Sequence, residues 1–346
     1  MAMGNLTDVP TSFRQVSMNK TSAIRSAAFV LSTLVAAGFT SLAAAAEPAS
    51  TAVTQHAQTG LYRYQLGDFE ITVLSDGSVP QDLHALLKGG SQPEVDGLLA
   101  RSFLASPVEA SINAFLIDTG SRLVLVDVGA GDFFGPGYGG KLLGRLRAAG
   151  KSPADITDIL LTHVHTDHSG GLVHEGKAVF PKAALHVGQP DVDFFLAPAH
   201  QQGVGGYDKA YFAQATAALT PYKASGQLQP FSGVTTLLPG ITAIPTPGHT
   251  PGHAFYRVEG RGQAITFIGD VVHVQAVQFP QPAITITYDV DQPAAAQQRQ
   301  AQFEKLASDR ALVAAPHLPF PGLGHVRQEK TGFSFVPVDH HDRDGQ

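Results

Sequence analysis

The most informative stretch of the sequence is Thr162-His163-Val164-His165-Thr166-Asp167-His168-Ser169-Gly170-Gly171, which directly follows an apolar run. Four side chains able to bind a metal ion fall within six positions. A solvated polar loop would not need histidines at this density after a buried strand. Residues two apart in an extended segment point the same way, so His163 and His165 can offer two nitrogens to one metal ion. Asp167 and His168 lie at the turn beyond and can face a second metal, while Gly170-Gly171 lets the backbone turn closely around the site.

Ligand-type side chains also follow three later apolar strands. They are His249 after residues 241–244, Asp270 after 264–268 and His317 after 312–315. The full set is five histidines and two aspartates, which is more than one metal ion can use. An aspartate shared by two metals, with a water or hydroxide between them, would complete a binuclear centre. Nitrogen and oxygen ligands without thiolate suit Zn(II), and also Mn(II), Fe(II) or Co(II).

Composition removes several other classes of protein. The 346 residues hold 23 Lys+Arg and 29 Asp+Glu, so the formal net charge is −6 and no basic cluster is present. We therefore expect no nucleic-acid partner. The chain has no cysteine, which excludes disulfides, thiolate-bound zinc, iron–sulfur clusters and thiol nucleophiles.

The N-terminal part of the sequence predicts export. Residues 1–46 combine Lys20 and Arg25 with a long uncharged apolar run that ends in four alanines, as a cleaved secretory signal does. A retained membrane anchor is the alternative, since residues 26–46 could span a bilayer, but their weak hydrophobicity favours cleavage. We expect a secreted or periplasmic protein with no stable membrane association after cleavage.

The rest of the chain predicts one compact domain at 61–338, between a flexible lead-in at 47–60 and a tail at 339–346. Period-two and short apolar runs predict the strands, namely 62–66, 69–74, 113–118, 123–127, 156–161, 183–187, 241–244, 254–258, 264–268 and 312–315. Helical spacing predicts helices at 141–149, 191–196, 208–219 and 292–307, the last with Asp291 as its N-cap. Two successive stretches of the chain each consist of strands followed by helices. This order predicts two sheets whose outer faces are covered by the helices.

The segment 162–168 resembles the H-x-H-x-D-H signature of the metallo-β-lactamase superfamily, and His249, Asp270 and His317 match its later ligand positions in order. The resemblance implies an αββα sandwich of two mixed sheets, in the α/β (α+β) class, with two divalent metal ions at one edge. It also assigns the ligands. His163, His165 and His249 would hold the first metal, Asp167, His168 and His317 the second, and Asp270 would bridge them.

Within the superfamily the sequence looks like methyl parathion hydrolase and its relatives. Three stretches carry this similarity, at 66–72, 276–279 and 317–325. The resemblance implies that Phe134, Phe195 and Tyr211 hold an aryl leaving group, although ordinary packing explains each of these aromatic residues equally well. It also implies small-molecule substrates and pairing into a homodimer.

The implied activity is hydrolysis by a metal-bound hydroxide, with Asp167 or Asp270 moving the proton. The predicted substrates are organophosphate triesters such as methyl parathion and related aryl esters. The main alternative is a lactonase acting on acyl-homoserine or other lactones, and a metal-binding protein without turnover is a weaker one.

Four further residues are candidates for roles beside the metals. His325 is an alternative to His317, and His253 would support a ligand or be purely structural. His273 would line the mouth of the pocket. Asp127, at the end of another strand, is expected to be buried behind the ligands rather than to bind a metal.

Overall fold

The computed structural model describes residues 58–340. The predicted signal peptide at 1–46, most of the lead-in at 47–60 and most of the tail at 339–346 lie outside these residues. The described elements run from Leu61 to Pro337 and so fall within the predicted domain at 61–338. None of the helices in this part of the chain is both long enough and apolar enough to cross a membrane.

The first sheet has seven strands in the order β1-β2-β4-β5-β6-β9-β10. Their bounds are β1 Leu61–Leu66, β2 Phe69–Gln81, β4 Val108–Asp118, β5 Leu123–Val126, β6 Asp158–Leu160, β9 Ala184–Gly188 and β10 Leu228–Phe231. Strands β1, β2, β4 and β5 pair antiparallel, whereas β5, β6, β9 and β10 pair parallel. The sheet is therefore mixed, and its parallel half carries the histidine-rich stretch.

The second sheet also has seven strands, in the order β11-β12-β13-β14-β16-β17-β18. Their bounds are β11 Thr235–Leu238, β12 Ile241–Pro245, β13 Ala254–Gly260, β14 Gln263–Phe267, β16 Leu312–Ala314, β17 Leu323–Gln328 and β18 Phe333–Pro337. Only the β14–β16 pair is parallel. The parallel pair places the ends of β14 and β16 at the same edge.

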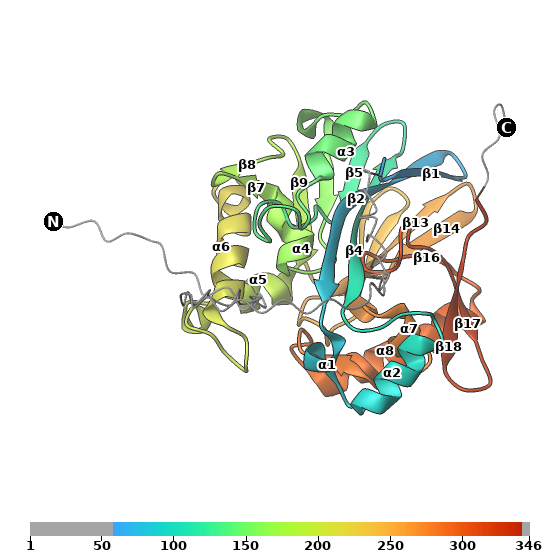
Figure 1. Ribbon diagram of the computed structural model, residues 1–346. Helices are drawn as coiled ribbons and strands as arrows, with labels where there is room; N and C mark the ends of the chain where they lie inside the picture. The colour runs from blue at the N-terminus through green and yellow to red at the C-terminus, as the bar shows by residue number, and fades with distance from the viewer. Residues whose placement is uncertain (1–57, 341–346) are drawn as a thin grey trace, which may run out of the picture. The chain divides into compact units, whose positions relative to one another are not determined.

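The two sheets share an apolar core formed by alternate residues of their facing strands. Phe115 on β4 and Phe267 on β14 meet there, with ring centroids 5.1 Å apart, and neither has appreciable exposed surface. Leu160 and Tyr256 belong to the same cluster. In Figure 1, β2 and β4 lie between the helices α4 and α6 on one side and the strands β13, β14 and β16 on the other.

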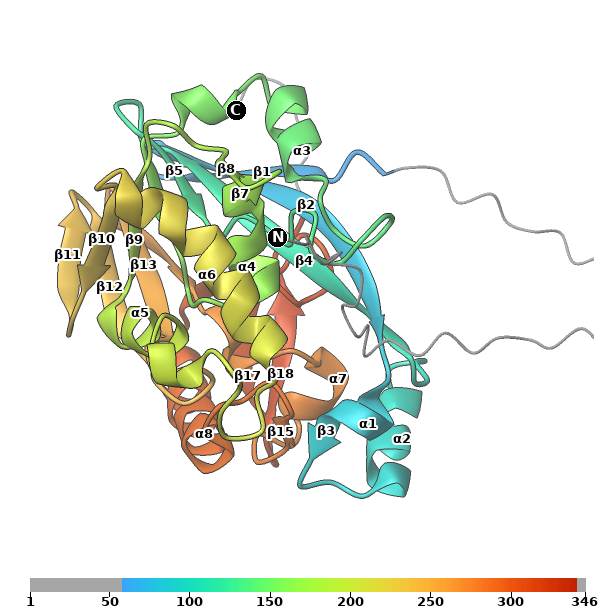
Figure 2. The same ribbon diagram turned by 90° about the vertical axis from the view of Figure 1, so that its left-hand side faces the viewer.

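Helices cover the outer faces of both sheets. The first sheet packs against α3 (Leu142–Ala148), α4 (Thr166–Ser169), α5 (Gln189–Phe195) and α6 (Lys209–Ala224), and the second against α8 (Gln292–Ser308). Figure 2 shows α6 and α4 in front of the first sheet. This is the αββα sandwich that the resemblance implied.

Smaller elements complete the fold. A separate apolar cluster joins α1 (Leu83–Leu86), α2 (Gln92–Ala100) and α7 (Gln275–Gln278) to the two-stranded sheet of β3 (Leu87–Lys88) and β15 (Thr285–Ile286). Strands β7 (Val173–His174) and β8 (Lys177–Ala178) form another small sheet. Four short 3₁₀ turns are η1 Pro153–Asp155, η2 Gly170–Leu172, η3 Pro198–His200 and η4 Gly269–Val271.

The predicted strand at 69–74 was too short. Strand β2 continues to Gln81 through a bulge between Ser75 and Gly77, where the pairing with β4 shifts. Gly77 has a φ of 141°, and a Cβ there would lie 2.9 Å from the backbone of Gly139. A bulge interrupts the strict alternation on which the prediction depended. Helix α2 and the strands β10, β11, β17 and β18 were missed, whereas the Asp291 cap of α8 is confirmed by its bond from the Ala294 amide.

We predict that Phe115→Ala destabilises the fold by about 3–5 kcal/mol, because it removes a large buried ring from between the sheets. Urea unfolding at equal metal loading would measure the change in the free energy of unfolding. The control is Phe103→Ala, since Phe103 is 99% exposed and its loss should stay within about 0.5 kcal/mol. Equal effects of the two substitutions would contradict the assigned core.

Candidate metal centre

All seven predicted ligands meet at one edge of the sandwich. His163 and His165 follow β6, and His165 is the N-cap of α4, the short helix that carries Asp167 and His168. His249 lies between β12 and β13, Asp270 lies in η4 after β14, and His317 follows β16. The carboxyl ends of parallel strands share one edge of a sheet, which explains why residues so distant in sequence come together.

Three imidazole nitrogens converge on one point. His163 Nε2, His165 Nδ1 and His249 Nε2 lie 3.0–3.2 Å from one another. Each ring uses its other nitrogen elsewhere, so a neutral ring has no proton left to place between these three atoms. Three lone pairs that face each other at hydrogen-bond distance are the donor set of a metal ion.

A second group lies beside the first. Asp167, His168 and His317 offer ligand atoms within 4.8 Å of one another. Asp270 Oδ2 lies between the two groups, 3.1 Å from His317 Nε2, 3.3 Å from His168 Nε2 and 3.4 Å from His249 Nε2. The carboxylate of Asp270 is therefore placed to bridge two metal ions.

The remote nitrogen of every ligand histidine has a partner that orients the ring. Three of these nitrogens donate to oxygens: His168 Nδ1 to Asp127 at 2.9 Å, His249 Nδ1 to Asp289 at 2.7 Å and His317 Nδ1 to the Ser111 carbonyl at 2.8 Å. The other two lie beside hydroxyl groups. His163 Nδ1 is 3.1 Å from Thr162 Oγ1, and His165 Nε2 is 3.2 Å from the Tyr207 hydroxyl. Such bonds set the tautomer that leaves the inward nitrogen free to bind a metal. Asp127 thus lies behind the ligands, as expected.

Two buried acids at the site were not predicted from the sequence. Asp289 orients His249, and its other oxygen accepts from the Ile286 amide and lies 3.6 Å from the buried Arg299. Asp191 accepts hydrogen bonds from the Val164 and Gly252 amides, which fixes the two ligand loops to each other. Each acid lies three residues after a strand, Asp191 after β9 and Asp289 after β15. Asp270 and His317 have the same spacing, so this signal could have found both acids.

Glycines allow the backbone to approach the centre. A Cβ on Gly170 would lie 2.2 Å from the Ala130 carbonyl oxygen, and one on Gly171 would lie 2.0 Å from that of Val128. Both distances are shorter than any atomic contact allows, so only glycine lets α4 pack this closely against the loop after β5.

The charge balance of the centre favours a cation. Burial alone would raise the pKa of Asp270, but the surrounding imidazoles, His168 first, hold it well below its ordinary value. Burial lowers the pKa of His249, but its bonds to the carboxylates of Asp270 and Asp289 raise it more, to about 9. The buried carboxylates thus attract positive charge into the site, and a metal ion would supply it.

The residues fit a pair of divalent metal ions on chemical grounds. Within the described residues, His168 Nε2 and Asp270 Oδ1 are buried atoms without a hydrogen-bond partner. Buried polar atoms of this kind need a partner that the polypeptide does not supply. The donor set of imidazole nitrogens and carboxylate oxygens suits zinc and its first-row neighbours.

Comparison with known proteins identifies the family. The family model described as the metallo-beta-lactamase superfamily matches residues 108–317, a range that holds all seven ligands. The chain belongs to the metallo-β-lactamase superfamily.

Two solved structures are similar along most of the chain. The hydrolase AbOPH, also of this superfamily, is 35% identical with a TM-score of 0.77, over 83% of this chain and 100% of that one. AidC, a dizinc quorum-quenching lactonase solved with the product N-hexanoyl-L-homoserine, is 30% identical with a TM-score of 0.75, over 82% of this chain and 99% of that one.

Curated relatives match over a shorter region. Probable metallo-hydrolases of Mycobacterium bovis and Mycobacterium tuberculosis are each 28% identical over 184 residues, which is 46% of this chain and 56% of each relative. The chain thus spans about half the length of the curated relatives that it matches.

The three aromatic residues predicted to hold an aryl group lie in different surroundings. Phe195 has no exposed surface and packs edge-on against the His165 ring, at 5.8 Å between centroids. It supports a ligand from behind and offers a substrate no surface. Tyr211 is half-buried with its ring 6.1 Å from that of His165, whereas Phe134 is half-buried without a ring contact to any described histidine.

The three further candidate histidines, His325, His253 and His273, differ in burial and in their distance from the ligands. His325 is exposed on β17 and donates to the Ala311 carbonyl, so the structure leaves His317 alone in the ligand position. His253 is buried, and its Nε2 accepts from the Asp270 amide at 3.0 Å. The expectation that His273 lines the pocket mouth was wrong, because the residue is 4% exposed and lies within the cluster.

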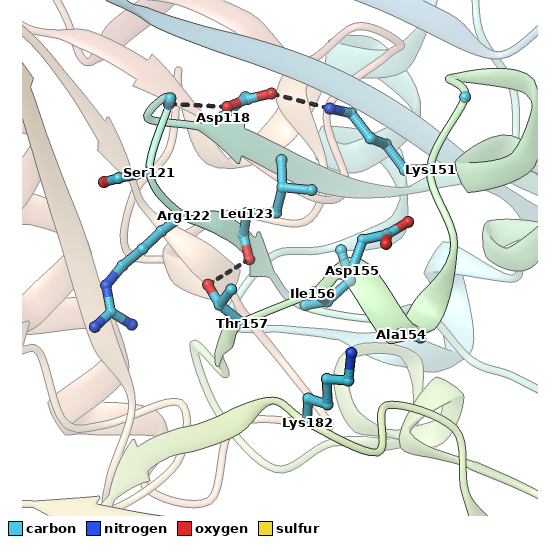
Figure 3. A pocket seen from close by; sticks show the side chains of 12 residues that line it. Asp118, Ser121, Arg122, Leu123, Lys151, Ala154, Asp155, Ile156, Thr157 and Lys182 are labelled. Carbon is cyan, nitrogen blue, oxygen red and sulfur yellow. Dashed lines mark hydrogen bonds and ion pairs between the residues drawn. The ribbon is translucent and has the colours of Figure 1, made fainter.

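An open surface depression lies at the other end of the parallel strands, around the beginnings of β5 and β6 (Figure 3). Two of the basic side chains that line it already form ion pairs, Lys151 with Asp118 at 3.0 Å and Arg122 with Asp158 at 2.8 Å. This depression contains none of the candidate ligands and is separate from the metal centre.

We predict that Asp289→Ala weakens metal binding about 10–100-fold, because His249 loses the bond that orients its ring. Competition with a chromogenic chelator would measure the affinity. Asp193→Ala is the matched control, since Asp193 is an exposed carboxylate on α5. An unchanged affinity of the Asp289 variant would contradict the orienting role.

Proposed function

We propose that the protein is a binuclear metal-dependent hydrolase of esters with a strained or activated leaving group. The observation that carries the proposal is the arrangement of two ligand groups around Asp270, with access to solvent at one point. The side chain of Asp167 is 19% exposed, whereas those of the other ligands in its group, His168 and His317, are 0% and 2% exposed. Substrate would approach the centre from the side of Asp167.

Bound metal ions would lower the pKa of a bound water and polarise the oxygen of the bond to be broken. The histidines and aspartates described above would hold these ions. Asp167 is the acid at the open side and would accept the proton of the attacking water and pass it to the leaving oxygen. Asp270 is buried and ionised, which suits it to bridging, so we assign proton movement to Asp167 first.

Phenols at the rim would bind the substrate. Burial raises the pKa of Tyr211 and of Tyr288, and the negative charge of Asp167 raises both further. Both side chains are half-buried and stay protonated at neutral pH. They can therefore donate hydrogen bonds to a carbonyl or phosphoryl oxygen as negative charge develops there.

Lactones are the substrate class that we place first. The similarity to the lactonase AidC covers most of both chains. The prediction that Phe134, Phe195 and Tyr211 bind an aryl group is weakened, because Phe195 is wholly buried. Organophosphate triesters such as methyl parathion, together with aryl esters, remain the second candidate, favoured by Tyr211 beside His165.

We extend the proposal to the setting of the enzyme. The apolar run and small residues at 26–46 support export to a periplasmic or extracellular space. The net charge of −6 favours small-molecule substrates over nucleic acid. Pairing into a homodimer is a further proposal, which the mass of the purified protein in solution would test.

The first test compares two substrates on one zinc-loaded preparation. We predict a higher kcat/KM for an acyl-homoserine lactone than for dimethyl p-nitrophenyl thiophosphate, by at least about tenfold, which corresponds to about 1.4 kcal/mol. The reverse preference would support the organophosphate hydrolase. Absence of turnover on both substrates and on p-nitrophenyl esters would overturn the proposed activity.

The second test removes one ligand. We predict that His165→Ala lowers the bound metal measured by mass spectrometry and reduces kcat/KM by more than the roughly 100-fold typical of residues that only orient a ligand. His325→Ala is the control, because His325 is exposed on β17 and distant from the centre. Full activity and metal content in the His165 variant would exclude it as a ligand.

A further inference from the structure

Arg299 is a charged residue at a core position of helix α8. The buried residues of this helix are Ala295, Arg299, Phe303 and Leu306, which lie three or four positions apart and so form one face. Arg299 is 0% exposed, and a guanidinium is almost never buried unless it is paired. An apolar residue would be the ordinary choice at this position, so the reason for the arginine lies in the contacts of its guanidinium.

The guanidinium connects α8 to two segments that lie beside the metal ligands. Its Nε donates at 2.6 Å to the carbonyl of Val271, the residue that follows Asp270. Its Nη1 donates to the carbonyls of Pro282 and Ile284 at 2.9 and 2.8 Å, in the segment that precedes Asp289. One side chain therefore holds three backbone carbonyls from two segments.

The third nitrogen of the guanidinium faces Asp289. Nη2 lies 3.6 Å from Asp289 Oδ2 and has no hydrogen-bond partner among the described residues, and both side chains are 0% exposed. Asp289 Oδ1 accepts a hydrogen bond from His249 Nδ1 at 2.7 Å. Arg299, Asp289 and His249 thus form a chain of contacts that begins in α8 and ends at a metal ligand.

The positive charge of Arg299 matters most when a metal ion is bound. A histidine that binds a metal through Nε2 keeps its proton on Nδ1, so its ring is neutral. His249 would then donate to Asp289 without balancing the charge of that carboxylate. In the described part of the chain, Arg299 is the one lysine or arginine that pairs with Asp289. Stability alone does not explain such a pair, because apolar residues often replace a buried ion pair without loss of stability.

We propose that Arg299 is a positioning residue for the metal centre, which holds the Asp289 carboxylate against His249 and so sets the affinity of the site for the ion that His249 binds. The inference rests on the proposed metal-dependent function, but not on the identity of the substrate. Arg299 acts through Asp289, and its own bonds to the backbone carbonyls keep the guanidinium in place.

The test is a double-mutant cycle on the full chain, with Arg299→Met, Asp289→Ala and both substitutions together. Competition with a chromogenic chelator would measure the zinc Kd of each variant, and circular dichroism would establish that each is folded. We predict that Arg299→Met weakens zinc binding about tenfold, and that the double variant binds zinc as Asp289→Ala does, within about threefold. Two residues that act in series share one effect, which can be lost only once.

Phe303→Ala is the matched control for a purely structural change. Phe303 lies one turn after Arg299 on the same buried face of α8, and its ring stacks on that of Phe279 at 4.5 Å between centroids. The substitution should lower the urea midpoint of the metal-free protein, because it leaves a cavity in the core. The zinc Kd should stay within about twofold of the wild-type value.

The outcomes separate this inference from the proposed function. An unchanged zinc Kd in Arg299→Met would overturn the inference, and so would a loss in the double variant equal to the product of the two single losses. If Arg299→Met does not fold alone, the double variant, which leaves neither charge of the pair buried, is compared with Asp289→Ala. Equal affinity then supports the inference, and a further loss overturns it.

The wild-type protein supplies the remaining distinction. A chain that binds zinc but hydrolyses none of the named substrates would overturn the proposed hydrolase and leave the role of Arg299 standing. A chain that binds no zinc would overturn both.

Discussion

Three imidazole nitrogens, from His163, His165 and His249, face one another at 3.0–3.2 Å in a buried site. Burial lowers the pKa of His249, but the carboxylates of Asp270 and Asp289 raise it to about 9, so they draw positive charge, as a proton or a metal ion, to this contact. A polypeptide keeps such an arrangement only where a cation binds, because unpaired buried polar groups are unfavourable. The surrounding strands and loops hold these three nitrogen atoms in position.

The sandwich meets this constraint by ending several strands at one edge. Strand β6 from the first sheet and β12, β14 and β16 from the second each deliver a ligand where the strand stops. Partners behind the ligands, such as Asp127 and Asp289, then set the tautomers. The positions of the ligands therefore depend on how the two sheets pack against each other. The Phe115–Phe267 contact is part of that packing.

The open side of the centre has a different character from its interior. Interior ligands have their remote nitrogens paired, whereas Asp167 is partly exposed and the phenols of Tyr211 and Tyr288 remain protonated around it. His273 is buried beside the ligands, with its Nε2 3.0 Å from Asp270 Oδ2. Selection among lactones, aryl esters and phosphotriesters would occur in this region, since the metal chemistry is common to all three.

The sequence alone indicated the ligand types and two sheets with helices outside, because both are local signals, whereas the αββα sandwich was implied by the resemblance to the superfamily. The histidines at 163, 165 and 168 are close in sequence, and apolar runs before His249, Asp270 and His317 mark strand ends. Tertiary structure decided the rest. Asp289 and Asp191 act through contacts with distant loops, the burial of Phe195 depends on α6 packing, and His273 points inward because Gln278 holds its backbone. Most of these contacts join residues far apart along the chain, and the sequence pattern does not state which residues meet.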